Sequence, residues 1–144
     1  MIPSNAKASI SALDQRPERP GIFVIAVFVL LASFMMLAGL LCLVAPVSFA
    51  RPAGYPLSGH FVHDAEAFQL GIGATLVLSL FCRDGLVVAL AGYLVGNTAH
   101  MADHPIDQAL GGQHWDAWLL GAVSALTGAA LIAEVRRKSR RLSS

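Results

Sequence analysis

Five histidines and several carboxylates are the residues in this sequence that are best suited to bind a metal ion. His100 and His104 are four residues apart, the spacing that places two imidazoles on one face of a helix. Glu66, His63 and Asp107 are the further candidate ligands. Imidazole and carboxylate ligands suit zinc, copper or iron, so one hypothesis is a metal or haem site. The alternative is that these histidines form ordinary hydrogen bonds, because pairs at this spacing also arise by chance.

A second set of polar residues lies within otherwise apolar segments. It consists of Gln69, Asn97 and Tyr93, and Glu66 lies on the same helical face as Gln69. A polar group that faces hydrocarbon without a partner is penalised by several kcal/mol. We therefore expect these side chains to turn inward and bond between helices. Gln69 and Asn97 lie about one turn below the same membrane surface, so their stripes are expected to meet.

The composition indicates that lipid surrounds the segments carrying these residues. The chain has 144 residues, of which 56% are hydrophobic and 13% charged, and its mean hydropathy is +0.63. A soluble domain has about 25% charged residues, and one this short could not bury so much apolar surface. The net charge of +1 gives no reason to expect nucleic-acid binding. The sequence contains no HExxH, GxSxG, P-loop or GxGxxG motif, so no catalytic residue is predicted.

Four apolar segments are long enough to cross a bilayer as helices. The predicted fold is therefore all-α, a four-transmembrane-helix bundle. Its spans cover about 21–44, 65–82, 86–102 and 115–135, within a membrane domain of 21–135. Residues 1–20 are predicted to be a disordered cytoplasmic tail and 136–144 a basic cytoplasmic tail. The first apolar segment is too long for the 7–15-residue core of a secretory signal, so we expect it to be retained.

Prolines and aspartates predict where the spans begin and end. Three prolines between 45 and 62 predict a loop there. Pro105 predicts that the third span ends before it, because the residue preceding a proline disfavours the helical conformation. Asp64 and Asp116 are predicted helix caps, where a carboxylate also meets the positive end of the helix.

The basic residues predict the orientation. Nine of the ten Lys and Arg lie in the two tails and the turn near Arg83, and only Arg51 lies elsewhere. Cytoplasmic segments carry such an excess, so both termini are predicted to be cytoplasmic and all histidines to lie on the outer side. Cys42 and Cys82 then lie at different depths, which excludes a disulfide between them within one chain.

Two segments carry a family resemblance. Glu66–Gly73, with the sequence EAFQLGIG, and Gly92–Asn97, with the sequence GYLVGN, follow a long first span. This layout resembles small uncharacterised bacterial membrane proteins of the DoxX-like four-helix type, over roughly residues 20–135. The resemblance implies a bundle whose activity is mostly unassigned. The predominance of arginine over lysine fits a bacterial protein, and the predicted location is the inner plasma membrane.

Three functional hypotheses follow. The first is a non-enzymatic accessory or interaction component of a membrane complex, whose partners are membrane lipids and a homo-oligomer or larger membrane assembly. The second is the outer-facing metal or haem site, with a redox role as one version. The third is an oligomeric transporter or channel, because Glu66, Gln69 and His100 would suit a path through the membrane.

Overall fold

The computed structural model describes residues 20–51, 59–82, 84–107 and 115–143. Within these ranges every regular element is a helix, and there are five of them. They are α2 (Ile22–Val44), α3 (Pro46–Ala50), α4 (Gly59–Ser79), α5 (Gly85–Asp107) and α6 (Asp116–Leu142). The predicted all-α class is thereby confirmed.

A proline separates α2 from α3. Ala45 precedes Pro46 and has φ −144° and ψ 57°, outside the helical region, as expected for a residue before proline. Its backbone N–H still donates to the carbonyl of Leu41, at 2.9 Å. Pro46 then opens α3 at a position where its missing N–H removes no helical bond. The chain therefore bends at Ala45 and helical structure resumes within the segment predicted to be a loop.

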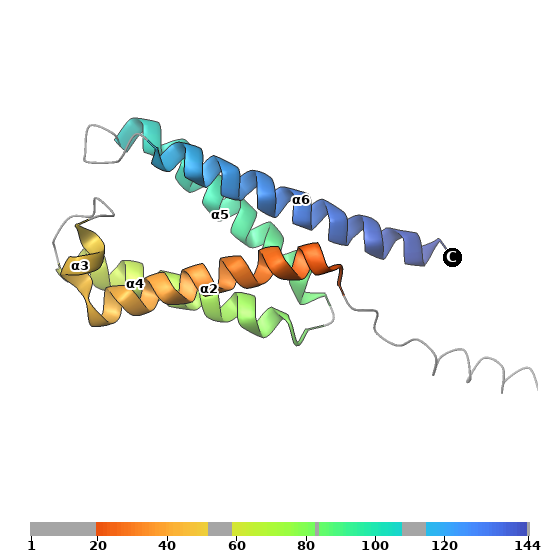
Figure 1. Ribbon diagram of the computed structural model, residues 1–144, viewed down its shortest axis with the longest axis horizontal. Helices are drawn as coiled ribbons and strands as arrows, with labels where there is room; N and C mark the ends of the chain where they lie inside the picture. Colours follow the sequence, from red (N-terminus) through yellow and green to blue (C-terminus); the bar gives the residue numbers. More distant parts are fainter. Residues whose placement is uncertain (1–19, 52–58, 83, 108–114, 144) are drawn as a thin grey trace, which may run out of the picture.

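The first helical hairpin consists of α2 and α4, which lie side by side and antiparallel (Figure 1). Their register follows from three contacts. The thiol of Cys42 faces Gln69, and Gly39 packs against Leu70. Gly73 packs so closely against Met36 that an added Cβ would lie 3.0 Å from the Met36 backbone nitrogen. The glycines thus let the two backbones approach each other.

A tight turn connects α4 to α5. The N–H groups of Leu80, Phe81 and Cys82 donate to carbonyls three residues earlier, at 3.1–3.2 Å. The last turn of α4 is therefore wound more tightly than an α-helix. A Cβ at Gly85 would lie 2.8 Å from the Cα of Ser79, so the return of the chain requires glycine at this position.

The second helical hairpin consists of α5 and α6. Met101 contacts the position of Gly121, and Leu94 that of Gly128, so these helices are also antiparallel. The same register continues toward the α4–α5 turn and places Asp84 opposite Lys138. These two residues form an ion pair.

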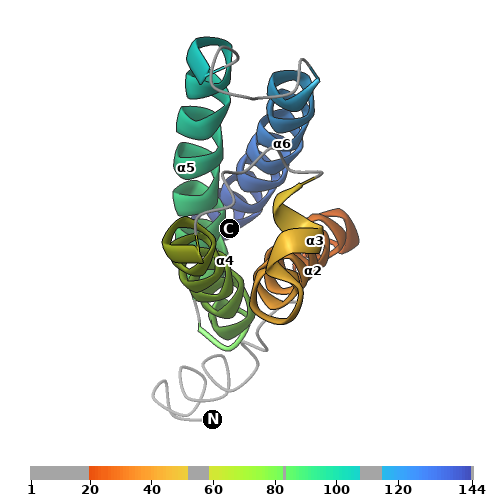
Figure 2. The ribbon, with the colours of Figure 1, turned by 90° about the vertical axis from the view of Figure 1, so that its left-hand side faces the viewer.

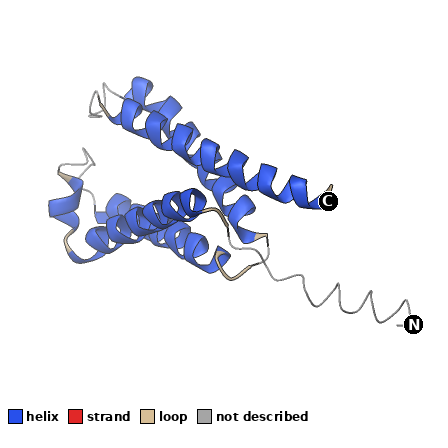
Figure 3. Ribbon diagram, turned by 45° about the vertical axis from the view of Figure 1, so that its right-hand side comes forward, coloured by secondary structure: helices blue, strands red, loops and turns tan. Residues whose placement is uncertain are grey.

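Among the residues that the structure describes, the two hairpins share a hydrophobic core at one end. Its buried residues come from the first half of α2, the end of α4, the start of α5 and the second half of α6: Val24, Val27, Phe28, Leu31, Ala32, Leu76, Leu86, Ala89, Leu90 and Ala130. A smaller cluster at the other end joins α2, α3 and α4 through Cys42, Ala50 and Val62. The hairpins accordingly diverge from the α4–α5 turn toward α3 and the start of α6 (Figures 1 and 3). The end at the α4–α5 turn is called the closed end below, and the end at α3 and the start of α6 is called the open end. Figure 2 shows the hairpins from the open end.

In the described part of the chain, three helices are long and apolar enough to cross a membrane: Ile22–Val44, Gly85–Asp103 within α5 and Asp116–Arg140 within α6. They correspond to the first, third and fourth predicted spans. The predicted second span lies in α4, which is long enough but carries several polar residues in its first half.

Three helices are longer than the spans predicted within them. Helix α4 begins at Gly59, before the span start at 65, α5 continues to Asp107, past 102, and α6 continues to Leu142, past 135. The predicted end of the third helix before Pro105 is wrong, because α5 runs through this proline. Pro105 is compatible with α5 because it lies near the helix end, where it removes a single backbone bond. Hydropathy marks only the part of a helix that suits lipid, and each of these helices extends beyond that part.

Candidate functional site

Asn97 connects the two helices of the second hairpin. Its Nδ2 donates to the carbonyl of Leu120 and to Oγ of Ser124, at 2.8 Å each. The hydroxyl of Thr98 lies 3.1 Å from the same Oγ. Gly121 and Ser124 lie one turn apart on the same face of α6. Their small side chains leave room for the approach of Asn97. The amide therefore bonds between helices, with α6 as its partner.

Gln69 lies in the first hairpin instead. Its Oε1 accepts a weak hydrogen bond from the buried Cys42 thiol across 4.0 Å. Gln69 and Asn97 thus face different partner helices, α2 and α6, although their stripes were expected to meet. The divergence of the hairpins at this end of the molecule is the reason. Tyr93, the third residue of the predicted network, is half-buried and packs against the shared core.

The structure brings together two of the five predicted metal ligands. His63 Nδ1 lies 3.3 Å from Glu66 Oε2, one turn apart on α4. His100 is exposed on α5, in the other hairpin. The side chains of His104 and Asp107 lie outside the described ones. Among the residues that are described, no group of three His, Cys, Asp or Glu could hold a metal ion.

Neither predicted helix cap is in place. Asp64 lies five residues inside α4, because that helix begins at Gly59. Asp116 is the first residue of α6, and Trp115 occupies the N-cap position without a side-chain cap bond. The carboxylate of Asp116 nevertheless lies in the first turn, where the positive end of the helix stabilises a negative charge.

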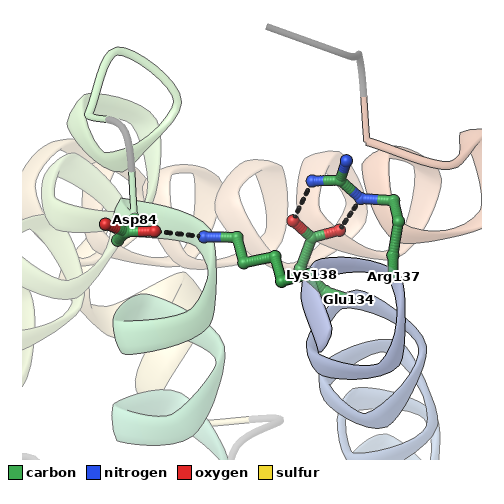
Figure 4. Close-up of polar contacts among 4 residues, drawn as sticks. All are labelled: Asp84, Glu134, Arg137 and Lys138. Atoms are coloured by element: carbon green, nitrogen blue, oxygen red, sulfur yellow. Dashed lines mark hydrogen bonds and ion pairs between the residues drawn. The ribbon is translucent and has the colours of Figure 1, made fainter. Parts of the chain in front are cut away.

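A charged cluster at the closed end of the molecule, which the sequence analysis missed, consists of Glu134, Arg137, Lys138 and Asp84 (Figure 4). Glu134 is 1% exposed and accepts two hydrogen bonds from Arg137, at 2.9 and 2.6 Å. Lys138 Nζ lies 2.6 Å from Asp84 Oδ1 in the α4–α5 turn. The sequence does contain a pattern for the first pair, because Glu134 and Arg137 are three residues apart and lie on one face of a helix. The pattern is easily overlooked, since it lies where the apolar segment meets the basic run.

These two pairs perform different tasks. The Glu134–Arg137 pair neutralises a carboxylate that is buried among apolar helices, where an uncompensated charge would be strongly destabilising. The Lys138–Asp84 pair connects the end of α6 to the turn that joins the hairpins, and Asp84 is 74% exposed. The cluster has the character of a structural support rather than of a reactive centre.

No family model, curated protein or solved structure matches this chain. The assignment of its sites therefore depends on its own residues and contacts.

Proposed function

We propose that this chain is a four-span membrane protein with both ends in the cytoplasm, and that it is a non-enzymatic component of a membrane assembly. The antiparallel register of α2 and α4 carries the proposal. Contacts at Cys42–Gln69, Gly39–Leu70 and Met36–Gly73 keep α4 alongside α2 over successive turns. A helix packed along a membrane span lies at the same depth as that span, so α4 crosses with α2.

The polar half of α4 is compatible with this position. Its 21 residues span about 32 Å at 1.5 Å per residue, close to the thickness of the hydrocarbon core. Gln69 is shielded by α2, and the His63–Glu66 pair lies near the end of the helix, where it can reach the interface. The four-helix layout also supports the proposed likeness to DoxX-like membrane proteins.

The use of the polar side chains supports an assembly role. Asn97, Gln69 and Glu134, which lie at least two turns from the ends of their helices, all bind neighbouring protein groups. Large apolar side chains such as Phe68, Val95 and Trp118 are at least 71% exposed. Lipid or other membrane helices would cover them.

The test of this role is the oligomeric state in a membrane-like environment. Native mass spectrometry from several mild detergents and nanodiscs should show a homo-oligomer or a complex with a second membrane protein. Crosslinking in the membrane before extraction should give the same species. A lone monomer in every lipid and detergent, with no crosslinked species, would refute the assembly role while leaving the four-span topology intact.

A metal site remains a second candidate because His63 and Glu66 are already paired at the open end. Glu66 and His100 belong to different hairpins, so a metal that binds both would draw the hairpins together. Protein purified without a histidine tag should then contain metal that the His100→Ala/His104→Ala variant loses. Metal analysis and haem absorbance that are both blank would exclude this candidate. The described residues give no added support to the transporter hypothesis.

A further inference from the structure

The basic run at the end of α6 is divided by the geometry of the helix. Because α6 remains helical to Leu142, successive residues of the run point in different directions. Glu134, Arg137 and Lys138 are related by i, i+3 and i, i+4, so they share the face that packs on the rest of the protein. Two of the basic residues are therefore used in the internal pairs described above.

Arg136 and Arg140 lie on the opposite face of the same helix. They are four residues apart, one turn along α6, and both are exposed. At 100° per residue their directions differ from that of Glu134 by roughly 120–160°. Neither forms an ion pair with any residue in the described part of the chain. The protein thus presents two guanidinium groups, one turn apart, to its surroundings.

The depth of this pair follows from the other end of α6. Trp115 and Trp118 are exposed there, and tryptophan is enriched at the membrane interface. Arg136 lies 21 residues after Trp115, about 32 Å along the helix, which is close to the thickness of the hydrocarbon core. Arg140 lies about 6 Å farther on. The two arginines therefore reach the level of the lipid head groups.

We propose that Arg136 and Arg140 form a binding surface for the phosphodiester groups of anionic phospholipids. The inference assumes the proposed function, in that α6 must cross the membrane. Guanidinium is suited to this ligand because its planar array of donors matches two phosphate oxygens at once. Two arginines on one face would select an anionic lipid over a zwitterionic one, whose own cation competes for the phosphate.

The experiment titrates detergent-solubilised protein with phosphatidylglycerol or phosphatidylcholine and measures bound lipid by native mass spectrometry. Wild-type protein should bind phosphatidylglycerol more tightly, and added salt should weaken the preference. The Arg136→Gln/Arg140→Gln variant should lose roughly tenfold or more in affinity for the anionic lipid. The matched control, Lys7→Gln/Arg16→Gln, removes two charges from the N-terminal segment and should change the affinity less than about twofold.

The proposal is overturned if wild-type protein shows no preference for the anionic lipid, or if the control variant loses as much affinity as the test variant. The second result would mean that total charge decides binding. The test variant should keep the wild-type Tm, since neither arginine has an ion-pair partner in the described chain. If the Tm of the double variant falls, the single variants Arg136→Gln and Arg140→Gln replace it, provided that they keep the wild-type Tm. Their affinity for the anionic lipid is then compared with that of the wild type. Failure of the membrane proposal would be recognised separately, because carbonate would then extract the protein without detergent.

Discussion

At the scale of single residues, the two amides inside the helices, Asn97 and Gln69, each bond to the other helix of their own hairpin. Asn97 makes two bonds of 2.8 Å to α6, whereas Gln69 has a thiol at 4.0 Å as its partner on α2. A short bond to a carbonyl or hydroxyl is much stronger than a long one from sulfur. The two amides should therefore contribute unequally to stability.

Substitution of Asn97 by alanine tests this difference. We expect Asn97→Ala to lower the free energy of unfolding by about 1–2 kcal/mol, since it removes two interhelical hydrogen bonds. Gln69→Ala should cost less than about 1 kcal/mol. Unfolding in mixed micelles, followed by circular dichroism, gives both values. Equal losses would show that the bonds to Leu120 and Ser124 have no special weight.

The glycines of α4 allow a second prediction with an internal control. A methyl group at Gly73 would lie 2.7 Å from Met36 Sδ and 3.0 Å from its backbone nitrogen, whereas nothing lies within 4 Å of one at Gly71. Gly73→Ala should therefore separate α2 from α4 and cost about 1–3 kcal/mol. Gly71→Ala should be neutral or stabilising by up to about 1 kcal/mol, because alanine favours the helix. Thermal unfolding of the two variants distinguishes them, and a larger loss for Gly71→Ala would contradict the α2–α4 register.

At the scale of helices, the sequence predicts the apolar segments well and the helix ends poorly. The centres of α2, α5 and α6 coincide with predicted spans because a run of apolar residues reports directly on lipid contact. The ends depend on backbone bonding and tertiary contacts, which hydropathy does not report. The partner of Asn97 could not be predicted either. The row of polar residues on one face of α5 does not indicate which helix packs against that face.

The structural role of Glu134 depends on how far α6 extends and on which face of α6 is buried. The sequence places it next to a basic run, where a solvated carboxylate would be unremarkable. The structure instead buries it on the face of α6 that meets the shared core. Because α6 extends past the apolar segment, Arg137 is held one turn away and can compensate the charge.

Removal of one member of this buried pair should therefore be costly. We expect Glu134→Leu to lower the free energy of unfolding by about 3 kcal/mol, since it leaves Arg137 without its carboxylate. The double variant Glu134→Leu/Arg137→Leu should recover most of that loss, because no uncompensated charge remains. Lys138→Ala, which breaks the more exposed pair with Asp84, should cost less than about 1 kcal/mol. A double variant as unstable as Glu134→Leu would show that the pair does not act as a unit.

At the scale of the whole molecule, the arrangement is two hairpins joined at the α4–α5 turn. The shared core, the Glu134–Arg137 pair and the Lys138–Asp84 pair all lie at this closed end. At the other ends, the contacts identified in the described ranges lie within each hairpin, at Cys42, Ala50 and Val62 in one and at Asn97 in the other. Partners or ligands that act on the predicted histidine side would meet the part of the molecule with fewer contacts between hairpins.

The number of crossings is the prediction on which this description of the molecule depends. If α2 and α4 both cross, the N-terminal segment and the α4–α5 turn lie on one side of the membrane. If α4 does not cross, they lie on opposite sides. Cys82 is exposed at that turn, whereas Cys42 is buried, so native Cys82 alone can report its position in a Cys42→Ala background.

A membrane-impermeant maleimide should therefore label Cys82 in inverted vesicles and not in intact spheroplasts. The variant Ser4→Cys, in a background that lacks both native cysteines, should behave in the same way because the proposed topology places both sites in the cytoplasm. Gln113→Cys in that background should show the reverse pattern, which controls for access of the reagent. Labelling of Ser4→Cys and Cys82 from opposite sides would establish three crossings. Labelling of both from outside would keep four crossings but invert the protein, and the histidines would then lie in the cytoplasm.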